Sequence, residues 1–206
     1  FVKLIKIVAN KFARFYIFVI RGTPMMVQSL IFYYAIFNLF KRTGMSVTEI
    51  NRVWSLFISG LVTVSLNSTA YLAEVLRGGI LAVDAGQMEA ARSLGMTHWQ
   101  AMRRVVFPQA IKNSLPAIGN EFIINIKDSS VLCVLGVSDL MFMTRSVAGI
   151  YYKGTECYLI AATVYLFLTY LSSLLLKAIT GRMTAPDNTK RRQGNQTVDL
   201  GLPSSN

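Results

Sequence analysis

The residues best suited to bind a charged solute lie in one otherwise apolar stretch, from about Gln109 to Val134. They are Asn120, Glu121, Asn125, Lys127 and Asp128. Asn120 and Lys127 are seven residues apart, as are Glu121 and Asp128, so each pair shares one face of a helix. Ionisable groups within a membrane span cost about 2.5–3.5 kcal/mol and usually face a cavity or a partner.

Two interpretations of this set remain open. In the first, Asn120, Glu121, Lys127 and Asp128 line a translocation path, where the ammonium and carboxylate of one solute find opposite partners. In the second, Lys127 and Asp128 lie at the outer membrane interface and Glu121 forms a structural pair. Asn67, Ser68 and Thr69 pose a similar alternative, because they either hydrogen-bond to neighbouring helices or line the same path.

Patterns typical of enzymes are missing from the sequence. It has no G-x-x-x-x-G-K-[ST] loop and no H-E-x-x-H, and Ser138 stands in "LGVSDL", which lacks the second glycine of a nucleophile elbow. His98 is the only histidine, and Cys133 and Cys157 are isolated, so no metal site is predicted. We expect no catalytic residue and no bound cofactor in this chain.

The elements that position these residues are predicted to be membrane-spanning helices. Charged residues make up 15% of the chain, against roughly 25% in soluble domains. Val53–Ala73, Cys157–Leu176 and Gly22–Phe40 carry no charge over lengths close to the roughly 20 residues that cross a bilayer. The stretch from Gln109 to Val134 adds a fourth span. The predicted fold is all-α, a polytopic transmembrane helical bundle.

The first of these spans is expected to begin near Tyr16 and to carry Pro24 in its first turn, where proline is tolerated. Residues 1–181 would form the transmembrane domain, and residues 182–206 a polar, disordered tail.

The distribution of lysine and arginine predicts the orientation. The first 21 residues, the segment 74–112 and the chain from 177 onward carry five each, whereas the segments 41–52 and 127–153 carry three each. Alternating sides gives 15 against 6, which places the three richer segments in the cytoplasm. The net charge of +11 is explained in this way, since no soluble basic domain is present to bind nucleic acid.

The segment 84–108 is polar and is predicted to form two helices joined by a turn. Asp84 with Gln87, and Thr97 with Gln100, have the spacing of helix-capping pairs. Gly95 between them suits the left-handed residue that ends a helix.

The second helix of this segment is expected to stop at Pro108. An apolar face is predicted on it from three residues: Trp99, Met102 and Val106.

The string "EAARSLG", followed after nine residues by "VVFP", resembles the E-A-A-x-x-x-G…I-x-L-P signature of membrane permease subunits of bacterial ATP-binding-cassette (ABC) importers. The residues that match as written are Glu89, Ala90, Ala91, Gly95 and Pro108. Val105 and Phe107 replace the isoleucine and leucine, apolar for apolar.

Other segments are similar to the polar amino-acid permeases, the subfamily for glutamine, histidine and arginine. These segments are "RGTPMMVQ" (21–28), "YLAEVLRGGI" (71–80) and "PQAIKNSLPAIGNEFIINIKDSSV" (108–131), and the resemblance covers residues 12–180. Members have a type I importer fold with five spans, so the four spans found here suggest that the first is missing through truncation, processing or fusion to a preceding domain.

The resemblance implies a mechanism and a set of partners. Glu89, Ala90, Ala91, Gly95 and Pro108 would belong to a coupling loop that docks on a dimer of ABC ATPase subunits, where ATP and Mg²⁺ are used. A second permease copy or a paralogue and an extracytoplasmic solute-binding protein would complete the importer in the bacterial cytoplasmic membrane. The solute would be a polar amino acid, and general similarity favours glutamine. An ion-gradient-driven secondary transporter is the alternative, but we find no internal repeat of the kind such folds show.

Overall fold

The computed structural model describes residues 2–183, and the side chains of residues 5–181 within them. Throughout this part the secondary structure is helical: α1 (Val2–Gly22), α2 (Met25–Arg42), α3 (Val47–Val53), α4 (Leu56–Leu81), α5 (Ala85–Ser93), α6 (His98–Ala101), the π-helix η1 (Met102–Val106), α7 (Phe107–Asp128), the 3₁₀-helix η2 (Ser129–Leu135), α8 (Leu140–Tyr151) and α9 (Gly154–Met183). The predicted tail lies almost wholly outside the described residues.

Two helices within the described residues, Leu56–Leu81 and Gly154–Gly181, are long and apolar enough to cross a membrane. Two further spans are counted if each of two bent helix pairs is taken as one. These pairs are Ile5–Gly22 with Met25–Arg42, bent by 113°, and His98–Leu135 with Leu140–Tyr151, bent by 52°. By length and composition, therefore, up to four spans are present, in agreement with the count expected from the charge-free stretches.

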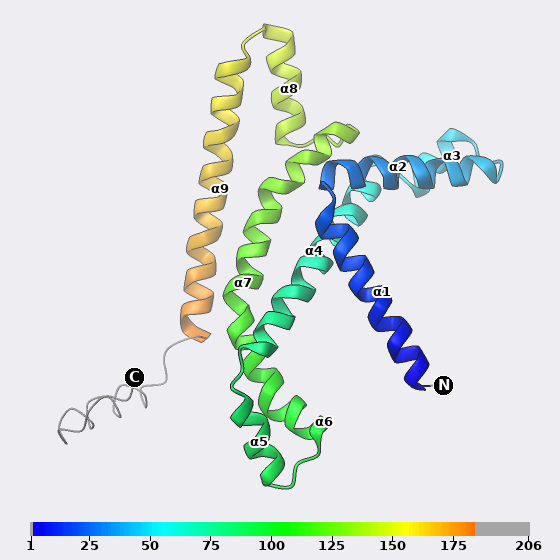
Figure 1. The fold of residues 1–206 in the computed structure, drawn as a ribbon. Coiled ribbons are helices and arrows are strands. Elements are labelled where there is room, and N and C mark those ends of the chain that lie inside the picture. Colours follow the sequence, from blue (N-terminus) through cyan, green and yellow to red (C-terminus); the bar gives the residue numbers. More distant parts are fainter. Residues whose placement is uncertain (1, 184–206) are drawn as a thin grey trace, which may run out of the picture.

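The first expected span is not one helix, contrary to the sequence prediction. A helix already forms upstream of Tyr16, and it ends at Gly22, so that α1 and α2 meet at a sharp corner (Figure 1). Pro24 is the N-cap of α2 with an extended ψ of 135°, and its ring lacks the N–H that would continue α1. Proline was correctly placed at a helix start, but a second helix before it was missed.

The buried side chain of Gln28 holds this corner together. Its Nε2 donates to the Ile20 carbonyl at 2.7 Å, to the Thr23 carbonyl at 2.9 Å and to the Thr23 hydroxyl at 2.7 Å. Its Oε1 accepts from Asn67 Nδ2 of α4 at 3.3 Å. One amide thus satisfies carbonyls that the end of α1 leaves without helical partners.

The segment between the stretch Gln109–Val134 and the span Cys157–Leu176 is not an irregular connection. It contains α8, whose N-cap Asp139 accepts from the Phe142 N–H at 2.7 Å. Tyr152 then takes a left-handed conformation, with a φ of 55°, and the chain turns into α9. A twelve-residue helix therefore precedes α9.

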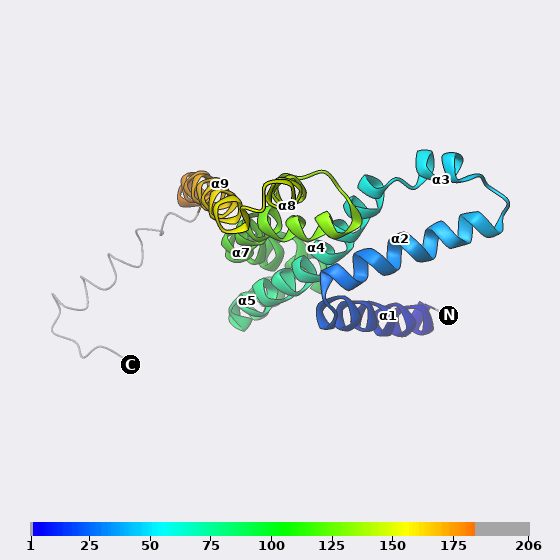
Figure 2. The ribbon, with the colours of Figure 1, turned by 90° about the horizontal axis from the view of Figure 1, so that it is seen from above.

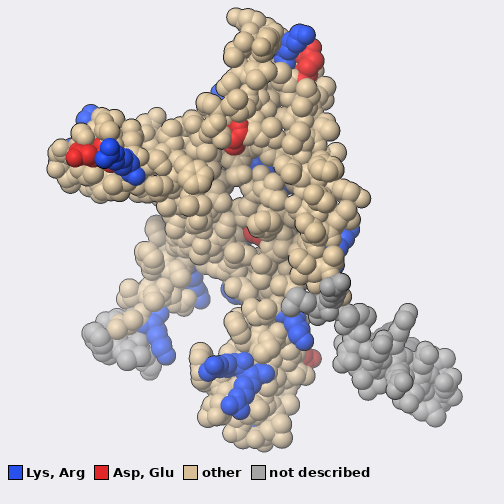
Figure 3. All heavy atoms as spheres, turned by 180° about the vertical axis from the view of Figure 1, so that it is seen from behind, with Lys and Arg blue, Asp and Glu red and all other residues tan. Residues whose placement is uncertain are grey.

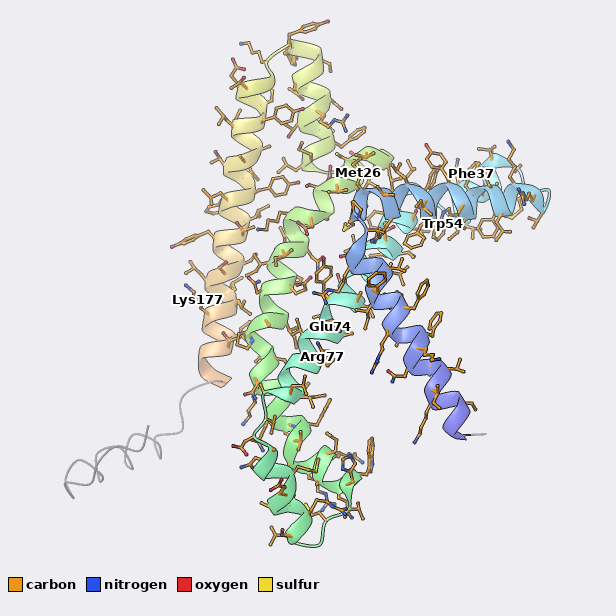
Figure 4. The ribbon with its side chains drawn as sticks, viewed as in Figure 1. Met26, Phe37, Trp54, Glu74, Arg77 and Lys177 are labelled. Carbon is orange, nitrogen blue, oxygen red and sulfur yellow. The ribbon has the colours of Figure 1, made fainter. Side chains whose placement is uncertain are left out.

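The basic segments gather at one end of the molecule. The start of α1, the α5–α6 pair and the far end of α9 point the same way, and the α8–α9 turn forms the opposite end (Figure 1). Viewed from above, α2 and α3 form an arm on one side of α4, whereas α8 and α9 lie on the other (Figure 2). Figure 4 shows Met26 and Phe37 along this arm and Trp54 where it returns to α4.

The pair α4 and α7 packs closely because Gly79 has no side chain. A Cβ at Gly79 would lie 2.7 Å from the Ala110 carbonyl oxygen and would overlap the Ser114 hydroxyl. Ser114 Oγ donates to the Ala110 carbonyl at 2.8 Å, within its own helix, and is buried by α4. Small residues at such contacts let helix backbones approach in membranes.

Gly79→Ala is therefore expected to push α4 and α7 apart and to destabilise the protein by about 1–3 kcal/mol, the usual cost of overpacking. Gly78→Ala is the matched control, because a Cβ at Gly78 meets nothing within 4 Å. The control should be neutral or slightly stabilising, since alanine favours helix. Thermal unfolding in detergent would be followed for both variants, and equal midpoints would contradict the close contact.

Candidate functional site

A central pocket of about 260 Å³ lies where α1, α2, α4 and α7 meet. It is lined by the corner and by two helices: Thr23, Pro24, Met25, Asn67, Tyr71, Glu121, Ile124 and Asp128. Its acidic groups are Glu121 and Asp128, and no basic side chain lines it. The pocket therefore has the charge and polarity to bind a cation, with amide, hydroxyl and carboxylate oxygens as acceptors.

The structure brings two of the four predicted path residues together in this pocket. Glu121 and Asp128 both line it, two helical turns apart on α7, as their seven-residue spacing predicts. Asn120 and Lys127 are exposed and do not line this pocket. The sequence missed Thr23 and Tyr71, because Thr23 lies in the corner between α1 and α2 and Tyr71 lies on α4, and only the tertiary fold brings them near α7.

Of the polar residues Asn67, Ser68 and Thr69 of α4, two form hydrogen bonds to other helices. Asn67 donates to Gln28 of α2, and Asn125 Nδ2 of α7 donates to the Ser68 hydroxyl at 2.9 Å. Thr69 bonds only within its own helix, to the Ser65 carbonyl at 2.7 Å. Asn67 also lines the central pocket, so this residue both joins two helices and borders the pocket.

A second candidate site is the α5–α6 pair, here called the coupling unit (residues 84–108). Asp84 caps α5 by accepting from the Gly86 N–H at 2.6 Å, whereas Gln87 was the partner expected from the sequence. Thr97 and Gln100 form the predicted capping box, with bonds of 2.9 Å and 3.3 Å. Gly95 is left-handed at a φ of 83°, also as predicted.

The second helix of the coupling unit does not stop at Pro108, which corrects the sequence prediction. The chain continues through η1 into α7, and Pro108 lies in the first turn of α7. Proline has no N–H to donate, and the wider π turn before it accommodates the ring without ending the helix. The coupling unit is therefore joined to α7 by continuous helix.

The π turn also changes which residues face inward. Ala101 and Val106, five residues apart, are buried together with Ala91 of α5. Trp99, from the predicted apolar face, is 70% exposed, and Leu94 is 81% exposed. Ala90 and Glu89 are also exposed, so this end of the molecule presents apolar and acidic groups outward.

Basic side chains surround that exposed surface. Arg92, Arg103 and Arg104 are all exposed, and basic groups gather on the lobe formed by α5 and α6 (Figure 3). Arg103 and Arg104 lie within η1. An exposed patch that combines a tryptophan, a leucine and arginines has the composition of a protein interface.

Residues 4–185 match the family described as binding-protein-dependent transport system inner membrane component. The chain belongs to this family. It is the permease subunit of an ABC importer, a transport component of the inner membrane that works with an ATPase and a solute-binding protein.

Relatives of the permease transport amino acids and related compounds, by their names. The chain is 34% identical to the glutamine transport system permease protein of Escherichia coli (strain K12) over 176 residues, which are 85% of this chain and 76% of that protein. It is 37% identical to a probable amino-acid permease protein of Bacillus subtilis (strain 168) over 182 residues, covering 88% and 78%. A nopaline transport system permease protein of Agrobacterium fabrum (strain C58 / ATCC 33970) is 34% identical over 173 residues, covering 82% and 70%.

The fold of the permease is also similar to a solved structure. A crystal structure of an amino acid ABC transporter with histidines aligns at a TM-score of 0.72 and 45% identity, covering 87% of this chain and 77% of that one. The all-α permease fold inferred from the sequence is thereby confirmed.

The Gln28 amide is expected to be essential for the corner beside the central pocket. Gln28→Leu should destabilise the permease by about 1–3 kcal/mol, because it leaves buried carbonyls unsatisfied. Gln87→Leu is the control, since its side chain is exposed and accepts one bond of 3.3 Å from Gln109. Thermal unfolding of the purified permease checks the difference. A Gln28→Leu midpoint equal to that of the control would show that the corner does not depend on this amide.

Proposed function

We propose that the permease imports a polar amino acid, with glutamine as the favoured substrate, and binds it in the central pocket. The pocket carries the proposal, because it places two carboxylates, an amide and a phenol around a space of about 260 Å³. An α-ammonium group would be held by Glu121 and Asp128 through charge-assisted hydrogen bonds. The names of the relatives, glutamine and amino-acid permeases among them, support the substrate class.

The corner at residues 23–25 would provide for the substrate carboxylate. The chain leaves α1 and enters α2 there, so the first N–H groups of α2 lack helical partners and favour negative charge. Thr23 and Met25 both line the pocket beside this helix start. Ammonium and carboxylate would then lie at opposite walls, which is the arrangement that a zwitterion requires.

The coupling unit would dock on the ATPase dimer in the cytoplasm, where ATP and Mg²⁺ are bound. The proposal assigns this contact to Glu89, Ala90 and Gly95, with Ala91 packed inside the unit and Pro108 in the first turn of α7. The common direction of the three lysine- and arginine-rich segments supports this orientation. A second permease chain, identical or related, would complete the translocation path.

Continuous helix makes this coupling mechanically direct. Movement of α6 by the ATPase would be carried through η1 into α7, and α7 bears Glu121 and Asp128. Closure of the ATPase dimer would therefore change the pocket that holds the substrate. Such π segments inside helices are frequent at functional sites.

Glu89→Ala is expected to lower amino-acid-stimulated ATPase activity and uptake together by about tenfold or more, as loss of a charge-assisted bond at an interface would. The measurement uses proteoliposomes that contain the permease, its ATPase and its binding protein, with radiolabelled L-glutamine. Glu156→Ala is the matched control, because Glu156 is an exposed carboxylate at the opposite end of the molecule. Unchanged coupling in assembled Glu89→Ala complexes would remove the coupling role from this residue.

Glu121→Gln and Asp128→Asn are expected to raise the KM for L-glutamine uptake by about tenfold each, since each removes a charged acceptor worth roughly 1.5–3 kcal/mol. Lys127→Gln should stay within twofold of wild type, because Lys127, although exposed like its neighbour Asp128, does not line the pocket. Uptake kinetics in the same proteoliposomes provide the test. A larger effect of Lys127→Gln than of Glu121→Gln would place the substrate elsewhere.

A further inference from the structure

A second, larger pocket lies between α1 and α4 on the side of the central pocket that faces the coupling unit. This lower pocket has a volume of about 520 Å³, and its polar lining is Arg14, Arg21, Tyr71 and Glu74. Tyr71 lines the central pocket as well. The two spaces therefore share one aromatic wall, although no carboxylate or guanidinium lines both.

The two pockets differ in charge. The central pocket is lined by two carboxylates, whereas the lower pocket is lined by two guanidinium groups and one carboxylate. That carboxylate, Glu74, is already bound by Arg77 through two hydrogen bonds of 2.7 Å and 3.0 Å (Figure 4). The lower pocket thus keeps an excess of positive charge and suits an anionic group.

The guanidinium of Arg21 has donors to spare. It forms an ion pair with Glu74 at 3.9 Å, a distance longer than a hydrogen bond, and it lies 5.2 Å from the centroid of the Tyr71 ring. The ring holds the cation by a cation–π interaction that costs no donor. Arg21 is therefore positioned at the shared wall with its N–H groups available for an arriving carboxylate.

Arg14 adds a second cation on the same face of α1, seven residues before Arg21. Among the described residues, no carboxylate lies within ion-pair distance of Arg14. Arg14 is exposed, and it also lines the lower pocket. Two arginines converging on one pocket offer the fork geometry that binds carboxylates.

We propose that the lower pocket is a second binding site for the transported amino acid, occupied after the central pocket and before release. Arg14 and Arg21 bind its carboxylate, and Tyr71 separates the two sites. The ammonium binds the second carboxylate oxygen of Glu74, because both hydrogen bonds from Arg77 go to Oε2. The inference rests on the proposed function of the central pocket. It adds a site on the exit side, where the order of charges is reversed: carboxylates hold the ammonium first, and arginines then hold the carboxylate.

Because the carboxylates of the central pocket come first and the arginines of the lower pocket second, the charges favour movement of the substrate from the first pocket to the second. A zwitterion held by its ammonium in the central pocket turns its carboxylate toward any nearby cation, and Arg21 lies against the wall between the pockets. Passage needs the Tyr71 ring and the Arg21 guanidinium to move apart, so substrate competes with the cation–π contact. Transfer from one site to the next then replaces one set of charge-assisted bonds by another.

The test is equilibrium binding of radiolabelled L-glutamine to the purified permease–ATPase complex, together with uptake by the complete importer. Wild type should bind two molecules per permease chain, Arg14→Gln one, and Arg14→Lys two with weaker affinity at the second site. In uptake, Arg14→Gln should lower kcat by about tenfold and leave KM within twofold, because the first site is intact. Lys11→Gln is the matched control, because Lys11 is an exposed cation on α1 like Arg14, one turn earlier, but does not line the pocket.

Each other outcome overturns the inference in a distinguishable way. Two sites retained in Arg14→Gln, or a single site in wild type that Glu121→Gln abolishes, would remove the lower site and leave the proposed function standing. Neither binding nor uptake of L-glutamine by wild type would reject the proposed substrate and the second site with it. An Arg14→Gln defect that occurs only in liposomes with anionic lipid, at unchanged glutamine stoichiometry, would assign the arginines to lipid headgroups.

Discussion

The close contact of α4 with α7 at Gly79 is the constraint on which the rest of the structure depends. Toward one end of this pair, Asn67 and Tyr71 of α4 face Glu121 and Asp128 of α7 across the central pocket. Toward the other end, α4 leads into α5 and α7 emerges from η1, so the same two helices hold the coupling unit. A side chain at Gly79 would separate the backbones between these two regions. The pocket and the coupling unit are therefore two ends of one packed helix pair.

Local signals were sufficient for the parts of the fold that short segments determine. Gly95 and the Thr97–Gln100 box were correctly predicted, because a left-handed turn and a capping box depend on a few adjacent residues. The shared face of Glu121 and Asp128 followed from helical periodicity. Pro108 was misread because a proline before an apolar run resembles a helix stop, and only the π turn shows that it starts a new segment of the same helix.

Features that depend on contacts between distant segments could not be predicted from the sequence. The corner between α1 and α2 depends on Gln28 reaching back to Ile20 and on Asn67, 39 residues away, reaching Gln28. Nothing in the sequence near Thr23 or Tyr71 indicates that both line a pocket with α7. The helix α8 was a different case, because Asp139 ahead of an apolar run is a local N-cap signal that could have been recognised.

The lysines and arginines that predict the membrane orientation include those that line the lower pocket. Lysines and arginines collect toward the end that carries the coupling unit, as the positive-inside rule requires for topology alone. Arg14 and Arg21 belong to that excess, yet they line a pocket instead of facing only solvent. In the proposed orientation the positive end of the span is the end through which an imported amino acid would leave, so a charge that orients α1 would also bind the solute. Import of a zwitterion from the central pocket to the lower pocket would then follow the same gradient of fixed charge that orients the chain.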